Sequence, residues 1–479
     1  MQLKLELGTA DSLAEGHAGA VRGQPRTAKD VLPQPSSKRS AASSAMQMEE
    51  VAKIDNLRAA FREVASNRGA HGVDGRGIED VRASLDVILK EVSHQLLRGT
   101  YEPGRIRRVW IPKGGGGKRG LGIPTVVDRM VQQGVLRVLQ PHIDPTFDES
   151  SHGFRPKRSC HTAIAEAKSH VEEGYEWVVD IDLEKFFDTV NHQRLMAALE
   201  RYVGDKRIRK LILKMLQASV VMPEGVVIES KEGTPQGGPL SPLLSNIVLS
   251  ELDEELRRRG HRFVRYADDC NIYVRSKRAG ERVMESISRF IEKRMRLKVN
   301  RSKSAVAEPS ERHFVGFRLV VNPRDLTVKI GLSERTRKRL RVKTRELTPR
   351  NLGVSLEEGI RRLNSYLQGW IGFFSVCETD LAVLRNTDSH NRRRLRAIQL
   401  KQWKRKRIRW KNLAKLGVSS RAAGNAVYGQ ARALWALAIH PSVHRALSNS
   451  HFENLGLLSL HSKWKQLQPI VPAQIPLFG

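Results

Sequence analysis

The chain is 479 residues long and 40% of its residues are apolar, so it is large enough for roughly two to four domains with cores of their own. It carries 83 Lys and Arg against 51 Asp and Glu, a formal net charge of +32, which predicts a polyanion, and best a nucleic acid, as its partner. Its three widely separated cysteines imply neither a disulfide framework nor a zinc site, and it shows no apolar run long enough for a membrane span or a signal peptide.

The predicted elements begin after a leader, residues 1–45, whose Gly, Ala, Ser and Pro content without periodicity predicts disorder. Apolar residues three or four apart predict one helix that begins at Glu49, and a second amphipathic helix at 84–97. A strand follows at 105–112. The glycine run 114–117 is typical of a flexible turn, because it lacks the Gly-Lys-Ser/Thr ending of a phosphate loop. Helices, strands and hairpins then alternate, which predicts an α+β fold.

Acidic residues stand at the ends of predicted strands. These strands are residues 177–183, 262–266 and 270–274. In the first, apolar and polar residues alternate, so that Asp180 and Asp182 share one face. The other two are joined by a tight turn that contains Asp268 and Asp269, where the side chains are exposed by the geometry of the turn.

Carboxylates in this arrangement can hold a pair of metal ions. In nucleotide polymerisation two divalent ions, about 3.5–4 Å apart, activate the attacking primer hydroxyl and stabilise the leaving pyrophosphate. Magnesium prefers hard oxygen ligands and needs few from the protein, so aspartates suffice, with Mn²⁺ as a substitute ion. An isolated Asp-Asp pair is most often only a favoured turn sequence. The pair at Asp268 is not isolated, because Asp182 ends a strand upstream.

Several motifs occur in an order that resembles the group II intron reverse transcriptase/maturase family over nearly all of the chain beyond residue 48. The motifs are Asn67–Gly75, Lys118–Thr125, Ser151–Pro156, Asp182–Asp188, Pro235–Pro242, Tyr266–Asp269 and Phe314–Phe317. The first resembles the family's N-terminal extension, the second resembles its first fingers motif, and Tyr-Ala-Asp-Asp resembles the reverse transcriptase signature. Chance recurrence of all of them in sequence is negligible.

The resemblance implies which acids bind metal. Asp182, rather than Asp180 or Asp188, matches the first metal ligand, and the two acids of the turn complete the catalytic set. The backbone of Leu183 matches a further ligand. Asp188 is instead expected to cap a helix predicted at 191–202.

The resemblance also implies a nucleotide site. Phe187 matches a steric gate, whose ring would clash with a 2′-hydroxyl and so favour deoxynucleotides, whereas Phe186 is expected in the core. The other residues that match nucleotide contacts are Gln236, Arg119, Lys113 and Lys303. Small residues around Gln236 let the backbone approach a ligand, and Lys303 matches a lysine that could protonate the pyrophosphate. A plain turn and solvated surface cations stay open as alternatives for these four residues.

Beyond residue 330 the chain becomes strongly basic. A Ser-x-x-Glu capping box at Ser355 predicts the start of a helix, which by resemblance belongs to a maturase region that forms a helical thumb. Residues 391–411, the basic run, contain eleven Lys or Arg and no acid. A solvated face is the usual meaning of such a run, but so many cations repel one another unless a phosphate backbone lies beside them.

The basic run therefore predicts contacts with nucleic acid. The residues assigned to them are Arg392, Arg393, Arg394, Lys404, Arg405, Lys406 and Arg407. Such contacts position a protein on its RNA rather than read its sequence. The tail, 412–479, resembles the family's DNA-binding region and ends without the residues of the family's C-terminal endonuclease, so cleavage of a second DNA strand is not expected.

The expected fold class is α+β, with right-hand polymerase fingers and palm followed by an α-helical thumb and a basic C-terminal DNA-binding region. The expected domains are 46–110 for the N-terminal extension and start of the fingers, 111–320 for fingers and palm, 321–400 for the thumb and 401–479 for the DNA-binding region. The expected function is that of an RNA-directed DNA polymerase, encoded by a group II intron, which assists splicing and reverse transcribes the intron RNA during retrohoming.

The expected partners are structured intron RNA, an RNA template with a DNA or RNA primer, target DNA and deoxynucleoside triphosphates, in the cytoplasm of a bacterial-type cell or at its nucleoid. No membrane partner is expected, and the oligomeric state stays open. Two alternatives are a splicing-only RNA-binding maturase and a reverse transcriptase of a defence or CRISPR system. The intact acidic turn argues against the first, and similarity that runs into the tail argues against the second.

Overall fold

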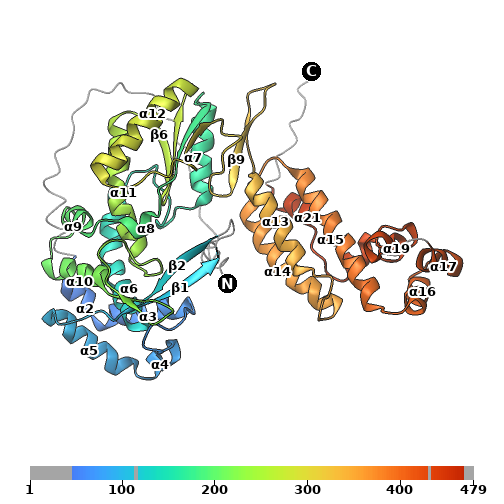
Figure 1. Cartoon of the computed structure of the whole chain (residues 1–479), viewed down its shortest axis with the longest axis horizontal. Helices are drawn as coiled ribbons and strands as arrows, with labels where there is room; N and C mark the ends of the chain where they lie inside the picture. Colours follow the sequence, from blue (N-terminus) through green and yellow to red (C-terminus); the bar gives the residue numbers. More distant parts are fainter. Residues whose placement is uncertain (1–45, 113–116, 430–432, 469–479) are drawn as a thin grey trace, which may run out of the picture. The chain divides into compact units, whose positions relative to one another are not determined.

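The structure, a computed structural model, describes residues 46–112, 117–429 and 433–468. These residues form two compact units that divide between Val315 and Gly316. We call them the N-terminal unit, residues 46–315, and the C-terminal unit, residues 316–468 (Figure 1). The leader predicted at 1–45 lies outside the described residues. No helix in the described stretches is both long and apolar enough to cross a lipid bilayer.

The N-terminal unit combines helices with two sheets. Its helices are α2 (Met48–Ala52), α3 (Ile54–Ser66), α4 (Ile78–Ala83), α5 (Leu85–Arg98), α6 (Val126–Ile143), η2 (Asp144–Thr146), α7 (Cys160–Glu172), α8 (Phe186–Thr189), α9 (His192–Glu200), α10 (Lys206–Gln217), α11 (Ser241–Arg258), α12 (Lys277–Phe290) and η3 (Ile291–Met295). Its strands are β1 (Ile106–Pro112), β2 (Lys118–Ile123), β3 (Trp177–Ile181), β4 (Val220–Val221), β5 (Val227–Ile228), β6 (Arg262–Tyr266), β7 (Asp269–Val274) and β8 (Ala305–Ala307).

The single helix predicted from Glu49 is wrong, because the chain forms two helices that break at Lys53. Lys53 has an extended backbone, with φ −51° and ψ 129°. The carbonyl groups that the break releases are bonded by side chains instead: Ser93 donates to the carbonyl of Ala52 and Asn56 to that of Val51. Periodicity cannot show such a break, since α2 and α3 both place their apolar residues in the same core.

A further correction concerns the helix predicted at 191–202. It is α9, and its N-cap is Asn191, whose side chain accepts a hydrogen bond from the backbone N–H of Arg194. The expectation that Asp188 caps this helix is therefore wrong. Asp188 lies within α8, one short helix upstream, and Asn191 is the residue adjacent to the first turn.

The two sheets differ in their strand order. The first is β2-β1-β4-β5, and the second is β6-β7-β3-β8 with antiparallel pairing throughout. In the second sheet Val179, Phe263 and Ile272 belong to the buried core, and helix α12 packs on the same side, where a Cβ at Gly280 would lie 2.5 Å from Val306. Because side chains alternate along a strand, Asp180 and the following Asp182 are directed to the opposite face.

The C-terminal unit is a two-stranded sheet followed by helices (Figure 1). Its elements are β9 (Phe317–Val321), β10 (Val328–Leu332), α13 (Glu334–Leu347), α14 (Leu356–Phe374), α15 (Leu381–Gln402), α16 (Lys406–Lys415), α17 (Ser420–Tyr428), α18 (Leu434–Leu437), α19 (Pro441–Ala446), α20 (Asn449–Asn454) and α21 (Leu460–Leu467). Ser355 caps α14 as predicted, by accepting from the N–H of Glu358. The carboxylate of Glu358 pairs with Arg361 and Arg362.

Candidate functional site

Three acidic residues lie at one end of the β6-β7-β3-β8 sheet. The register of β3 with β7 places Asp182, the residue after β3, opposite Asp269, the first residue of β7. The hairpin of β6 and β7 closes through a two-residue turn, Ala267 and Asp268, at the same end. The acids predicted from two distant strand patterns are thus neighbours in the fold.

Asp182 and Asp268 lie within each other's electrostatic field. Burial raises the pKa of Asp268 above its ordinary value, and the negative charge of Asp182 raises it further, whereas the charges of Arg119 and Arg265 oppose the shift. Two carboxylates that repel each other in a poorly solvated place are stabilised by a cation. The pair therefore suits a metal ion.

Asp182 also offers an oxygen atom to such an ion. Its Oδ2 is buried and accepts no hydrogen bond from the described residues, although Lys303 Nζ lies 3.4 Å away. A buried carboxylate oxygen that forms an ion pair but accepts no hydrogen bond has room for a further ligand. Within the described part of the chain no three His, Cys, Asp or Glu side chains are gathered closely enough to hold a metal ion by themselves. Magnesium needs few protein ligands, because it takes the others from phosphates and water, so the acids near Asp182 could hold it together with a bound nucleotide.

Asp180 shares the face of Asp182 but has a different partner. Arg312 donates to its Oδ2 through both Nε, at 2.9 Å, and Nη2. Burial raises the pKa of Asp180 even so, with Arg312 opposing the shift. Asp180 is thus neutralised within the protein, which favours Asp182 as the acid that is available to a metal.

The backbone around Asp182 is tied to a neighbouring segment. Its N–H donates to Ser304 Oγ at 3.0 Å, and its carbonyl accepts from the N–H of Asn300 at 2.8 Å. The next residue, Leu183, forms an isolated bridge with Val299. These bonds fix the direction of the chain where it leaves β3 and bring Lys303, assigned to the nucleotide from sequence, beside the carboxylate.

Phe187, assigned as the steric gate, lies beside the site on helix α8. Its ring is half-buried and makes an edge contact with Phe154 at 6.4 Å between centroids, and another with the buried Phe186 at 5.3 Å. Phe154 is 43% exposed. The two aromatic rings thus present a partly open apolar surface on one side of Phe187, whereas Phe186 packs in the core as expected.

Gln236 lies where two chain segments come close. Its carbonyl accepts from the N–H of Gly122 at 2.8 Å, and a Cβ at Gly237, where φ is +130°, would lie 2.6 Å from the carbonyl oxygen of Gly122. Only glycine fits such an approach. Arg119, on the same strand as Gly122, is exposed, and its charge acts on Asp268. Lys113, the remaining predicted contact, lies outside the described residues.

Six of the seven residues assigned to nucleic acid fall into two groups, and the seventh, Arg392, donates to Ser389 Oγ at 3.4 Å. Arg393 and Arg394 donate to the carbonyls of Trp435 and Thr348, at 3.1 Å in both cases, and Arg393 also stacks on the Trp435 ring at 4.0 Å. The second group, which we call the exposed cations, consists of Lys404, Arg405, Lys406 and Arg407. The first group fastens α15 to its neighbours, and the exposed cations face solvent.

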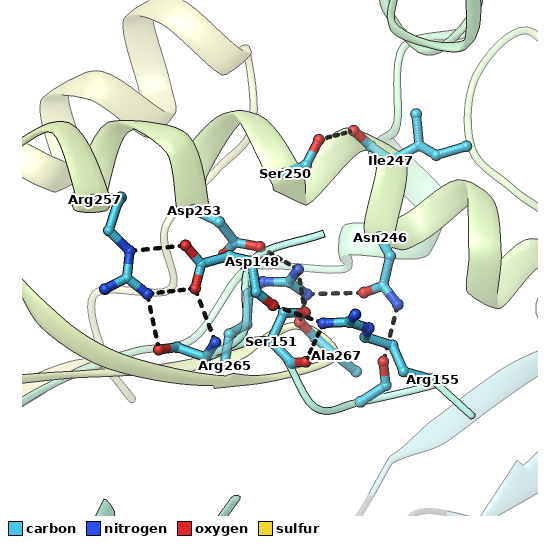
Figure 2. Close-up of polar contacts among 12 residues, drawn as sticks. Asp148, Ser151, Arg155, Asn246, Ile247, Ser250, Asp253, Arg257, Arg265 and Ala267 are labelled. Atoms are coloured by element: carbon cyan, nitrogen blue, oxygen red, sulfur yellow. Dashed lines mark hydrogen bonds and ion pairs between the residues drawn. The ribbon is translucent and has the colours of Figure 1, made fainter. Parts of the chain in front are cut away.

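A cluster of polar side chains that the sequence motifs did not indicate is buried beneath the acidic turn. Figure 2 shows it, centred on Arg265 and Asp253, which are 0% and 1% exposed. An arginine inside an apolar strand, between Val264 and Tyr266, is a signal that could have revealed it, because such a residue needs a buried partner.

Comparison with models of known protein families identifies the class of enzyme to which the chain belongs. A model described as reverse transcriptase (RNA-dependent DNA polymerase) matches residues 111–319, and one described as the group II intron, maturase-specific domain matches residues 337–417. The chain therefore has the reverse transcriptase fold, with mixed helix and sheet, and is an RNA-directed DNA polymerase by class. This class acts with divalent metal ions and on nucleic acid templates.

Similarity to individual proteins identifies the family within this class. The chain is 34% identical to protein YkfC of Escherichia coli (strain K12) over 305 residues, which are 55% of this chain and 80% of YkfC. It is 30% identical to the group II intron-encoded protein LtrA of Lactococcus lactis subsp. cremoris over 338 residues, and the match covers 56% of this chain and 55% of LtrA. The chain belongs to the group II intron-encoded reverse transcriptase/maturase family, as the motifs predict.

A solved structure also shows similarity, but it is too distant to add to this assignment. It is the partial Cas6-RT-Cas1--Cas2 complex, at 24% identity and a TM-score of 0.33, and the match covers 50% of this chain and 42% of the other. That likeness does not favour the CRISPR alternative over the intron family.

Proposed function

We propose that the N-terminal unit copies RNA into DNA with two Mg²⁺ ions held by Asp182, Asp268 and Asp269, with the backbone carbonyl of Leu183 as a further ligand. The observation that supports this proposal is that the three acids lie at one sheet end, where the buried Oδ2 of Asp182 forms an ion pair with Lys303 but accepts no hydrogen bond from the described residues. Bound there, the ions would activate the primer hydroxyl and neutralise the leaving pyrophosphate.

The remaining residues would bind and orient the incoming deoxynucleoside triphosphate. Arg119, exposed on β2 and electrostatically linked to Asp268, is placed to neutralise phosphate charge. Lys303, beside Asp182, would give a proton to the pyrophosphate. Phe187 would exclude a 2′-hydroxyl, and Gln236 would lie beside the nucleotide where the glycine-lined backbone comes close.

For the C-terminal unit we propose a helical thumb and a nucleic-acid interface that binds structured intron RNA, assists splicing and holds the template with its primer during retrohoming. The exposed cations support this, since cations that face solvent can contact phosphates. Target DNA is the proposed partner of the tail, and the bacterial cytoplasm or nucleoid is the proposed location.

The test is primer extension by an Asp268→Ala variant on an RNA template. We expect the rate to fall by about a thousandfold, because loss of a metal ligand removes several kcal/mol of charge stabilisation from the transition state. Affinity for intron RNA should stay within about twofold of the wild type, since the acids bind metal and the cations bind RNA. Undiminished extension by this variant would defeat the proposal.

A further inference from the structure

The guanidinium of Arg265 is fully buried and all five of its N–H donors are used. Nε and Nη2 donate to the carboxylate of Asp253 at 2.7 and 2.6 Å. Nη1 donates to Asn246 Oδ1 and to the carbonyl of Ala267, both at 2.9 Å, and Nη2 donates also to Ser151 Oγ at 2.7 Å. We call these five residues the Arg265 cluster (Figure 2).

The cluster joins three separate parts of the chain beneath the acidic turn. Asn246 and Asp253 lie on one face of α11, Ser151 belongs to the segment that runs beside β6, and Ala267 is the first residue of the turn itself. By strand alternation Arg265 is directed to the face covered by α11, opposite to the face that carries Asp182. Arg265 therefore supports the turn from behind, with the acids on the other side of the sheet.

The turn needs such support because its backbone is strained. Ala267 has φ +57°, at a position of a two-residue hairpin turn where glycine is favoured. A non-glycine residue in this region costs about 1–3 kcal/mol and persists only where the surroundings hold it. Gly153 lies so close that a Cβ there would overlap the backbone nitrogen of Ala267, and Asn246 Nδ2 holds the Gly153 carbonyl at 2.9 Å.

Stability alone does not account for a buried pair of this kind. Removing two charges from water costs about as much as their attraction returns, so apolar residues of similar volume serve the fold equally well or better. What the pair supplies, and apolar residues do not, is a set of directed bonds to the Ala267 carbonyl and to Ser151.

We propose that Arg265 is a positioning residue, which fixes the Ala267 carbonyl and thereby the direction in which Asp268 and Asp269 leave the turn. The inference rests on the proposed function in treating these two acids as metal ligands. It predicts that the cluster affects metal affinity and the chemical step while the fold stays intact.

The test is the double variant Arg265→Met with Asp253→Leu, which replaces the pair by apolar side chains and leaves no unpaired buried charge. We expect its thermal midpoint and RNA affinity to match the wild type. Its affinity for Mn²⁺, measured by electron paramagnetic resonance on the protein with bound primer and template, should fall by about 10- to 100-fold. The kcat of primer extension should fall by a similar factor, again about 10- to 100-fold, with a smaller change in the KM for the deoxynucleotide.

The matched control is Arg201→Gln with Glu254→Gln, an exposed pair at 3.0 Å whose acid is the neighbour of Asp253 on α11. It removes one positive and one negative charge, the negative one from the same helix, without touching the turn, and it should leave both measurements unchanged. Arg265→Lys keeps the charge opposite Asp253 but cannot reach Ser151 and Ala267 together. Its Mn²⁺ affinity and kcat should therefore lie between those of the wild type and the double variant. If the double variant does not fold, Arg265→Lys is the variant that tests the inference.

The inference would be overturned if a folded double variant had the same Mn²⁺ affinity and kcat as the wild type. If only Arg265→Lys folds, the same result in that variant would overturn it. Mn²⁺ binding needs no turnover, so it tests the Arg265 cluster separately from the proposed polymerase. Absence of extension by the wild-type protein itself would instead count against the proposed function.

Discussion

The acidic turn and the basic run are both concentrations of like charge, but their surroundings differ. Beneath the turn, Arg265 is paired with the carboxylate of Asp253 and both are removed from water. In the basic run, Arg393 and Arg394 donate to main-chain carbonyls, which carry no full charge. The first arrangement cancels its positive charge, and the second holds its cations in place without neutralising them.

The difference shows that arginine side chains serve two purposes in this protein. A fully neutralised arginine fixes geometry, as at the turn. An arginine bonded only to uncharged groups keeps its positive charge and repels its neighbours. In α15, burial and the charge of Arg392 lower the pKa of Arg396 to about 10. A phosphate backbone would relieve this repulsion, so the C-terminal unit is suited to bind a polyanion.

The largest expected effect is on the rate of primer extension, and it distinguishes Asp182, the residue after β3, from Asp180 within β3. Asp182→Asn should lower the rate of primer extension by about a thousandfold, because it removes a metal ligand. Asp180→Asn is the matched control: the same chemical change on the same face, at a residue already paired with Arg312. It should leave extension within about tenfold of the wild type, the loss reflecting the unpaired Arg312. Equal losses in the two variants would contradict the choice of Asp182.

A smaller effect is expected from the exposed cations. Changing Lys404, Arg405, Lys406 and Arg407 to Gln should weaken RNA binding by about 10- to 100-fold near physiological salt and reduce the slope of log affinity against log salt by about 3, since each phosphate contact contributes about 0.7–0.9. Filter binding over a salt series measures both. Extension at saturating template should not change.

The control for this prediction removes the same charge elsewhere. The residues changed to Gln are Arg278, Arg282, Arg289 and Lys293, four exposed cations of α12 and η3. If this variant loses as much affinity and slope as the first, net charge and not the placement of the exposed cations governs binding.

The smallest effect concerns stability near the turn. Glu166 accepts from Ser150 Oγ at 2.6 Å and contacts His152 Nε2 at 2.7 Å, in the segment that reaches Ser151. Burial by itself raises its pKa, but the hydrogen bonds from His152 and Ser150, together with the nearby His170, outweigh burial and lower the pKa to about 2. A depressed carboxyl pKa contributes stability above the unfolded value of about 4.5, and that stability is lost as the pH falls toward about 2.

Glu166→Gln should therefore lower the free energy of unfolding by about 1–3 kcal/mol at pH 7, and by progressively less below pH of about 4.5. Urea unfolding at several pH values measures the difference, with Glu281→Gln on the exposed side of α12 as the control. A difference that stays constant down to pH of about 2.5 would show that shape rather than charge is responsible.

The sequence was sufficient to predict the strands that carry the acids, because the alternation of apolar and polar residues and the choice of turn residues are local properties. It placed Asp182 at a strand end and Asp268 in a hairpin turn, and the structure has both there. Local signals were insufficient where partners lie far along the chain, as at Lys53, where the helix breaks and the distant Ser93 bonds the released carbonyl of Ala52.

By itself, then, the sequence determined the family, the chemical class and which residue types stand at each strand end, because motifs and periodicity are written in neighbouring residues. Only the tertiary structure decided which acid is neutralised by Arg312, which cations of the basic run are fastened to carbonyls, and that Arg265 lies beneath the turn. Each of these depends on contacts between residues far apart in the chain, which form when burial forces polar groups to find partners.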